Sequence, residues 1–263
     1  MLGVLVSSYR EGPPMLSTVH SALVRGVDFV YVLEAPVGHP TGAEPGDPSP
    51  LEELNSIGDD RLELYALGGG RGGFRDDADK RSRMLHRART IAKARGRGDG
   101  EPLWLLWLDG DELLVFGEYL ADSCYRVAQE TGAGGFPLRI VELDGSVALS
   151  YGKVIRGDVV TSYLHSSYQV RLSNGMVVAL PNVKVCGAGG IPWLSPELKA
   201  ELEAHQEAIL AKHRPPLAGE PHLLHRSLLR SPERTVERQS TAEGRWFSEI
   251  LGPDGELLRE VPR

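Results

Sequence analysis

The chain has 263 residues, of which 41% are hydrophobic and 25% are charged. This is an ordinary globular composition, and one large α/β domain with a substantial core is the expected arrangement. The net charge of -7 argues against a protein that binds nucleic acid through a wholly cationic surface, although local arginine clusters can still hold phosphates. No apolar run long enough for a membrane span occurs, and the N-terminal residues turn polar too soon for a signal peptide, so we expect a cytoplasmic enzyme. Cys124 and Cys186 lie far apart, which argues against a zinc site or a disulfide framework.

The N-terminal part of the chain has the pattern of a parallel sheet. An apolar run over 2–6 ends at Ser7, helically spaced apolar residues follow Pro13, and a second apolar run covers 29–33. A strand, a helix and a second strand form the unit of a parallel sheet with a right-handed crossover. We therefore expect two neighbouring parallel strands here.

A third strand over 62–67 and a lysine- and arginine-rich helix over 77–94 lead to the most apolar segment of the chain, 103–108. This segment is apolar on both faces, which is typical of a central strand. It stops at Asp109.

The remainder of the chain is rich in predicted strands and turns. A helix over about 118–129 comes first, and two tight turns follow, at Asp144-Gly145 and at Asn174-Gly175. The expected strands are 135–143, 146–149, 154–155, 168–172 and 176–180. Helices over 195–212 and 231–243 and a hairpin around 252–255 complete the prediction.

Acidic side chains follow the strands of the predicted parallel sheet. Glu11 and Glu34 come after the first two strands, and Asp109, Asp111 and Glu112 come after the central strand. In open α/β sheets, ligands bind at the carboxyl ends of the strands. Three carboxylates held close together repel one another unless a cation neutralises them, so a Mg²⁺ or Mn²⁺ ion whose shell is completed by substrate phosphates is the economical explanation.

Three segments resemble the family-2-type glycosyltransferases of the GT-A fold. They are VLVSSYREGPPMLSTVHSALVRGVDFVYVLEAP, WLLWLDGDELL with its D-x-D-E pattern, and LLHRSLLRSPERTVERQ. The resemblance implies a GT-A-like (Rossmann-like) mixed, mostly parallel sheet flanked by helices. It also implies a catalytic domain over 1–215 and a C-terminal segment over 216–263 that completes the active site.

The same resemblance implies roles for individual residues. Arg81 would approach the diphosphate, and Asp109 and Asp111 would approach the ribose and the metal. His225 would be the third protein ligand or a diphosphate contact, with His222 as the alternative. The residues implied to hold the nucleoside are Ser7, Tyr9, Glu11 and Glu34, and the residue implied to line the acceptor site is His165. In the family an aromatic residue often follows the histidine, whereas this chain has Arg226.

These observations lead us to expect an enzyme that transfers a sugar from a nucleotide-diphosphate sugar, with a UDP-sugar as the expected donor, to an acceptor hydroxyl. An inverting mechanism requires a general base, and a retaining route stays open. The candidate bases are Glu112, Glu142, Asp144 and Asp158.

The sequence does not identify the acceptor, and the candidates are a protein, a glycan, a lipid-linked sugar and DNA with a hydroxymethylated base. DNA could contact the C-terminal arginines Arg226, Arg230, Arg234 and Arg238, or these side chains could equally form salt bridges on an exposed helix.

Two other functions are compatible with the pattern. A nucleotidyltransferase also uses Asp-x-Asp with a metal, but it would carry a glycine-rich phosphate loop after the first strand, where this chain has SSYREGPP. A non-catalytic nucleotide-sugar-binding module would have no need of all three acids.

Overall fold

The computed structural model describes residues 1–8, 11–35, 50–67, 74–131, 133–142, 147–164, 169–179, 182–183 and 216–226. The predicted helices over 195–212 and 231–243 and the hairpin around 252–255 lie outside these residues. Within the described ranges, no helix is both long and apolar enough to cross a lipid bilayer.

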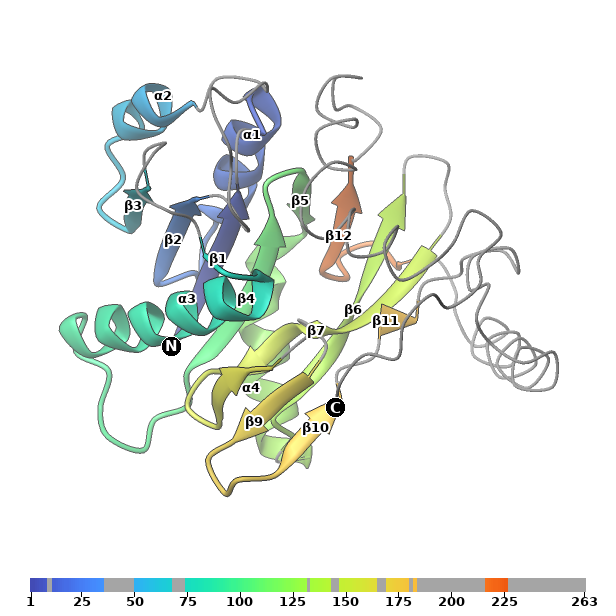
Figure 1. Cartoon of the computed structure of the whole chain (residues 1–263). Coiled ribbons are helices and arrows are strands. Elements are labelled where there is room, and N and C mark those ends of the chain that lie inside the picture. Colours follow the sequence, from blue (N-terminus) through green and yellow to red (C-terminus); the bar gives the residue numbers. More distant parts are fainter. Residues whose placement is uncertain are drawn as a thin grey trace, which may run out of the picture.

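The described chain alternates helices and strands in its first half and is strand-rich in its second (Figure 1). The helices are α1 (Pro13–Ala22), α2 (Leu51–Ser56), α3 (Asp77–Ala94) and α4 (Leu120–Thr131), the last preceded by a 3-10 turn over Gly117–Tyr119. The strands are β1 (Leu2–Ser8), β2 (Phe29–Glu34), β3 (Leu62–Ala66), β4 (Trp104–Asp109), β5 (Glu112–Val115), β6 (Gly135–Glu142), β7 (Val147–Arg156), β8 (Val160–Tyr163), β9 (Gln169–Leu172), β10 (Val177–Ala179), β11 (Asn182–Val183) and β12 (His222–His225).

The larger sheet has the strand order β3-β2-β1-β4-β7-β6-β12-β5, with β11 beside β7. Strands β3, β2, β1 and β4 are parallel to one another. β7 runs antiparallel to both β4 and β6, while β12 is parallel to β6 and antiparallel to β5. The expected α/β class and the mixed sheet flanked by helices are confirmed, and the parallel part is the one predicted from the N-terminal pattern.

Two hydrophobic clusters cover the two faces of this sheet. Val4 and Val6 of β1 pack with α1, α2 and α4 on one face, whereas Leu5 packs with α3 on the other. Figure 1 shows α3 and α4 on opposite sides of the sheet. Because successive side chains of a strand point to opposite faces, one apolar run serves both clusters, as expected of a central parallel strand.

The small sheet β10-β9-β8 lies on the α3 side, where Tyr163 packs with Trp107 of β4 at a ring-centroid distance of 5.2 Å. The helix predicted over 77–94 has the same bounds in the structure. Its first turn is capped by Asp76, which accepts a hydrogen bond of 2.7 Å from the Asp79 backbone N–H. Cys124 of α4 is buried in the hydrophobic cluster that also contains residues of α1.

Four strands, β5, β8, β11 and β12, were not anticipated from the sequence, and β11 has only two residues. β5, β8 and β12 are each only four residues long. β12 inserts between β5 and β6, although it lies more than 80 residues beyond them in the chain. This insertion brings the C-terminal part of the described chain to the edge where β4 ends.

Candidate functional site

The carboxyl ends of β1, β2 and β4 meet at one edge of the parallel sheet. Ser7 pairs with Asp109 across β1 and β4, and Ser8 pairs with Glu34 across β1 and β2. The chain crosses from β1 to β2 on one side and reaches β4 on the other, so this edge is a topological switch point of the kind that binds nucleotides in open α/β folds.

Residues 109–112, which we call the acidic turn, connect β4 to β5 at this edge. Gly110 is packed closely: a Cβ at this position would lie 2.7 Å from Ser8 Oγ and 2.8 Å from Glu11 Cγ. Only glycine fits without displacing these side chains. Glu11, which is buried, therefore lies directly against the acidic turn.

Two protein cations, Lys153 and Arg81, balance two of the three acids. Arg81 was expected at the site from the sequence, whereas Lys153 was not. Lys153 of β7 donates from Nζ to Glu112 Oε2 at 2.6 Å and to Asp109 Oδ2 at 3.2 Å. Arg81 of α3 lies 3.5 Å from Asp109 Oδ1 and stacks over the ring of Trp107. The expected repulsion among the acids is thus relieved in part by side chains of the chain itself, and the clustering of acids does not by itself require a metal.

Glu112 holds the turn together. Its Oε2 accepts a hydrogen bond of 2.8 Å from the Asp109 backbone N–H in addition to the one from Lys153. Burial raises the pKa of Glu112 and the Lys153 ammonium opposes that rise. With 2% of the residue exposed, this carboxylate does not face an acceptor. The expectation that Glu112 serves as a catalytic base is corrected accordingly: Glu112 shapes the site from inside.

Asp111 and His225 meet across the pairing of β5 with β12. His225 Nε2 lies 3.4 Å from Asp111 Oδ2, and the Asp111 side chain is fully buried. His222, at the other end of β12, instead donates from Nδ1 to the Glu220 carbonyl at 2.9 Å and lies beside the ring of Phe116. Of the two histidines left open by the sequence, His225 is the one beside the acidic turn.

The metal-ligating side chains of the site fit a divalent ion only if a substrate supplies further ligands. Among the described residues, no group of three or more His, Cys, Asp and Glu side chains is arranged to hold a metal ion. Asp111 and His225 supply two donors, and hard divalent cations commonly take one or two protein carboxylates and complete their shell with water and phosphate oxygens. Imidazole is also a suitable ligand for Mn²⁺.

Comparison with known proteins adds little to this geometry. No family model matches the chain, and no curated protein matches it. Among solved structures, residues 1–349 of TarS from S. aureus share 13% identity over 55% of this chain and 37% of that chain, with a TM-score of 0.38. A second structure of S. aureus TarS shares 12% identity over 54% of this chain and 21% of that chain, with a TM-score of 0.31. The chain thus spans well under half the length of either structure, and TM-scores this low carry no argument about function.

Asp158, expected as a candidate base, lies at the wrong edge of the sheet. It accepts a hydrogen bond of 3.0 Å from the backbone N–H of Leu103, which precedes β4, and it pairs with Arg156. The acidic turn follows the opposite end of β4, so the structure separates Asp158 from the site by the length of that strand. In the sequence, Asp158 and the other candidate bases were indistinguishable.

The other predicted site residues are only partly described. Tyr9, Asp144 and His165 lie outside the described residues, as do Arg230, Arg234 and Arg238. Arg226 is 8% exposed and donates to backbone carbonyls, so it is not available to an anionic polymer at the surface. This corrects the expectation that Arg226 contacts DNA or forms surface salt bridges.

Lys80, the neighbour of Arg81 in α3, is another buried cation at this edge. Its Nζ donates to the carbonyl oxygens of Ser8, the last residue of β1, at 2.9 Å and of Ala35, directly after β2, at 2.8 Å. Burial lowers the pKa of Lys80 from 10.5 to about 8, although Asp77, Glu34 and Asp109 favour its charged form.

The lowered pKa of Lys80 predicts an unusual dependence of stability on pH. Between pH 8 and 10.5 the unfolded chain binds more protons at this lysine than the folded chain does, so its contribution to the free energy of unfolding rises with pH. From pH 8 to about pH 9.5, the stability of the wild type relative to Lys80→Met should rise by roughly 1 to 2 kcal/mol. Urea denaturation of both proteins at each pH measures this difference. A difference that does not change with pH would show that the pKa of Lys80 is not lowered in the folded protein.

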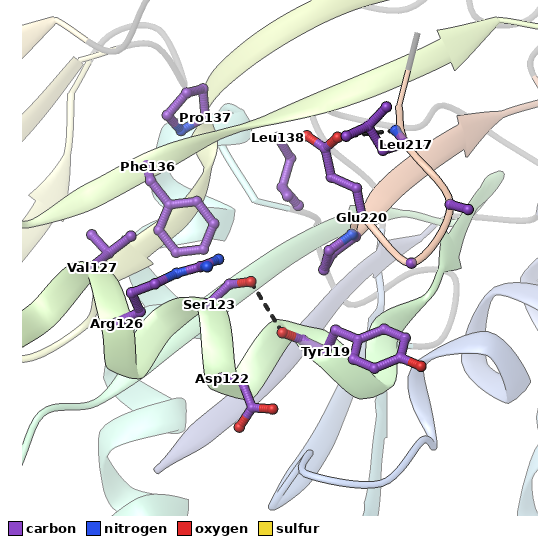
Figure 2. A pocket seen from close by; sticks show the side chains of 13 residues that line it. Tyr119, Asp122, Ser123, Arg126, Val127, Phe136, Pro137, Leu138, Leu217 and Glu220 are labelled. Carbon is purple, nitrogen blue, oxygen red and sulfur yellow. Dashed lines mark hydrogen bonds between the residues drawn. The ribbon is translucent and has the colours of Figure 1, made fainter.

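A separate groove of about 680 Å³ lies between α4, the start of β6 and the segment that leads into β12. Figure 2 shows Tyr119, Phe136 and Leu217 on different sides of it, with the Ser123 hydroxyl bonded to the Tyr119 carbonyl. Glu220, which also lines the groove, precedes His222 and lies at the end of β12 away from His225. The described lining residues include none of the predicted site residues, so the groove is distinct from the edge that carries the acidic turn.

Proposed function

We propose that the chain is a metal-dependent glycosyltransferase that moves a sugar from a nucleotide-diphosphate sugar to an acceptor hydroxyl. The observation that carries the proposal is the meeting of Asp111 and His225, 3.4 Å apart, at the carboxyl end of a parallel sheet. The sequence similarity of the acidic turn to the D-x-D-E segment supports the same function. A UDP-sugar is the proposed donor.

The proposed roles follow the geometry of the edge. Glu11 and Glu34, both buried beside the ends of β1 and β2, would bind the nucleoside together with Ser7. Arg81 lies beside Asp109 and would face the diphosphate, while Asp109, which is 36% exposed at its side chain, would accept from the ribose hydroxyls. Asp111 and His225 would hold Mn²⁺ or Mg²⁺.

The chemistry of such an ion is charge stabilisation: when bound, it would act as a Lewis acid on the departing diphosphate. The rest depends on the residues of the chain. Lys153 and Arg81 orient the Asp109 carboxylate, and Glu112 fixes the backbone of the acidic turn. Preorganised charges of this kind need no rearrangement at the moment of reaction, which is the source of their catalytic value.

A screen of nucleotide sugars for donor hydrolysis tests the proposal. The purified chain is incubated with each donor in the presence of Mn²⁺, of Mg²⁺ or of a chelator, and released nucleotide is measured. We expect release with at least one donor and none in excess chelator. A nucleotidyltransferase would instead release pyrophosphate from a nucleoside triphosphate, and a binding module would bind donor without turnover. Mass spectrometry of candidate acceptors then identifies the product.

Glu142 is the proposed general base for an inverting reaction. Among the candidate carboxylates, Glu112 is buried against Lys153, and Asp158 lies at the edge of the sheet opposite the acidic turn. The backbone of Glu142, in contrast, pairs with that of His225 across β6 and β12. Glu142→Gln should lower kcat by about 10²- to 10⁴-fold with little change in donor binding. Asp158→Asn is the matched control and should leave kcat within about twofold, since it removes a charge far from the site. Equal loss in both variants, or none in either, would exclude Glu142 from this role.

A further inference from the structure

The acidic turn is held in place from two sides. On one side, Ser8 and Glu11 pack against Gly110 so closely that a Cβ could not be accommodated. On the other side, a buried guanidinium from the C-terminal part of the chain donates to the Asp111 backbone carbonyl of the turn. This second support comes from Arg226, the residue directly after His225.

Arg226 makes a fork of hydrogen bonds to the backbone. The Asp111 carbonyl accepts from the Arg226 backbone N–H at 3.1 Å and from its Nε at 3.3 Å. The Nη2 group donates to the Pro14 carbonyl at the start of α1, at 2.8 Å. One side chain therefore connects α1, the acidic turn and the residue after β12.

Thr18 of α1 extends this connection to Gly110. Its hydroxyl accepts from Arg226 Nη2 at 3.2 Å and lies 2.9 Å from the Gly110 carbonyl and 3.1 Å from the Pro14 carbonyl. The Pro14 carbonyl already accepts a hydrogen bond from Arg226. We therefore assign the single hydroxyl hydrogen of Thr18 to the Gly110 carbonyl. Both carbonyls of the Gly110-Asp111 unit are thereby bound by side chains that are themselves buried.

We propose that Arg226 is a positioning residue, which sets the spacing between the Asp111 carboxylate and the His225 imidazole and so the affinity of the site for a divalent ion. The inference rests on the proposed function. Arg226 follows His225 directly in the chain, and it donates hydrogen bonds to the Asp111 carbonyl. It therefore fixes the backbone of both residues that would hold the metal ion. Lysine could not replace it, because a single ammonium group lacks the planar fork that reaches several acceptors in fixed directions.

Arg61 offers a matched control at the other end of the same helix. Its guanidinium donates to the carbonyls of Leu23 at 3.2 Å and Val24 at 2.9 Å, next to the carboxyl end of α1. Arg61→Met therefore removes a comparable set of contacts between α1 and a distant segment. It touches nothing at the acidic turn.

The experiment compares Arg226→Met, Arg226→Lys and Arg61→Met with the wild type. Free Mn²⁺ is followed by electron paramagnetic resonance during titration, with and without UDP, and amide hydrogen exchange is measured at residues 109–114 without ligand. Arg226→Met should weaken Mn²⁺ binding by about 10- to 100-fold, as is usual when a residue that orients a ligand is lost. It should also speed exchange in the acidic turn. Arg226→Lys should be intermediate, and Arg61→Met should match the wild type in both measurements.

The outcomes separate the inference from the proposed function. If the wild type binds neither Mn²⁺ nor UDP, the proposed function fails, and the exchange rates alone decide whether Arg226 orders the turn. If the wild type binds and Arg226→Met binds equally well, with unchanged exchange at 109–114, Arg226 is not a positioning residue. Loss of affinity in Arg61→Met as large as that in Arg226→Met would also overturn the inference, since the effect would then reflect general destabilisation.

Discussion

Replacing Asp111 with asparagine should lower metal-dependent donor turnover by about 10²- to 10³-fold, the loss typical when one preorganised electrostatic group is removed. Asparagine has the same shape but carries no charge, so it cannot balance a divalent ion against the diphosphate. The Asp111 carbonyl, which accepts from Arg226, is unchanged by the substitution. The fold should therefore remain intact, and the effect should be confined to kcat and to Mn²⁺ affinity.

Release of nucleotide from the donor at saturating substrate measures the effect, and a thermal melt followed by circular dichroism checks the fold. Asp158→Asn serves as the control, because Asp158 lies at the other edge of the sheet and pairs with Arg156. Full activity of the wild type in excess chelator, or of Asp111→Asn in saturating Mn²⁺, would exclude the proposed metal role.

Replacing Lys153 with methionine should destabilise the protein by about 3 to 5 kcal/mol, because it removes one partner of a buried ion pair and leaves a carboxylate uncompensated. Lys153 lies 2.6 Å from Glu112, and their side chains are 7% and 3% exposed. Charges so far from water are screened little, so this pair differs from the surface pairs that contribute less than about 1 kcal/mol.

The double variant Lys153→Met with Glu112→Gln distinguishes loss of a charge partner from loss of packing. Glutamine carries no charge that needs compensation, so the double variant should recover much of the stability lost in Lys153→Met. Arg156→Met, on the same strand but at the opposite edge, should cost about 1 kcal/mol because its ion pair with Asp158 is nearer the solvent. Urea denaturation at pH 7 gives all of these values. A cost for Lys153→Met no larger than that for Arg156→Met would refute the buried-pair argument.

Local patterning was sufficient to predict the parallel half of the fold. The apolar run before Ser7, the helix after Pro13 and the strand that stops at Asp109 each appear where the sequence indicates, because burial on both strand faces and proline in the first helical turn act on neighbouring residues. The position of the acids at the carboxyl edge followed from the same reasoning. The predictions for Tyr9 and His165 stay untested, since both lie outside the described residues.

The composition of the site depended on contacts between segments that are distant in the chain. Lys153 reaches Asp109 and Glu112 from β7, and Arg226 reaches Asp111 from beyond β12. Nothing in the local sequence marks these side chains as buried, because a lysine or arginine in a short segment is ordinarily solvated.

The sequence alone specified the parallel strands at the start of the chain and the acidic turn that ends the central strand, since periodicity and local turn chemistry act over a few residues. The tertiary structure alone decided three matters: which histidine faces Asp111, which carboxylate is buried on a lysine, and which lies at the opposite edge of the sheet. The physical reason is that the short strands β5 and β12 have too few residues to show a period of their own. Their pairing arises from the sheet that receives them, and that pairing sets His225 beside Asp111.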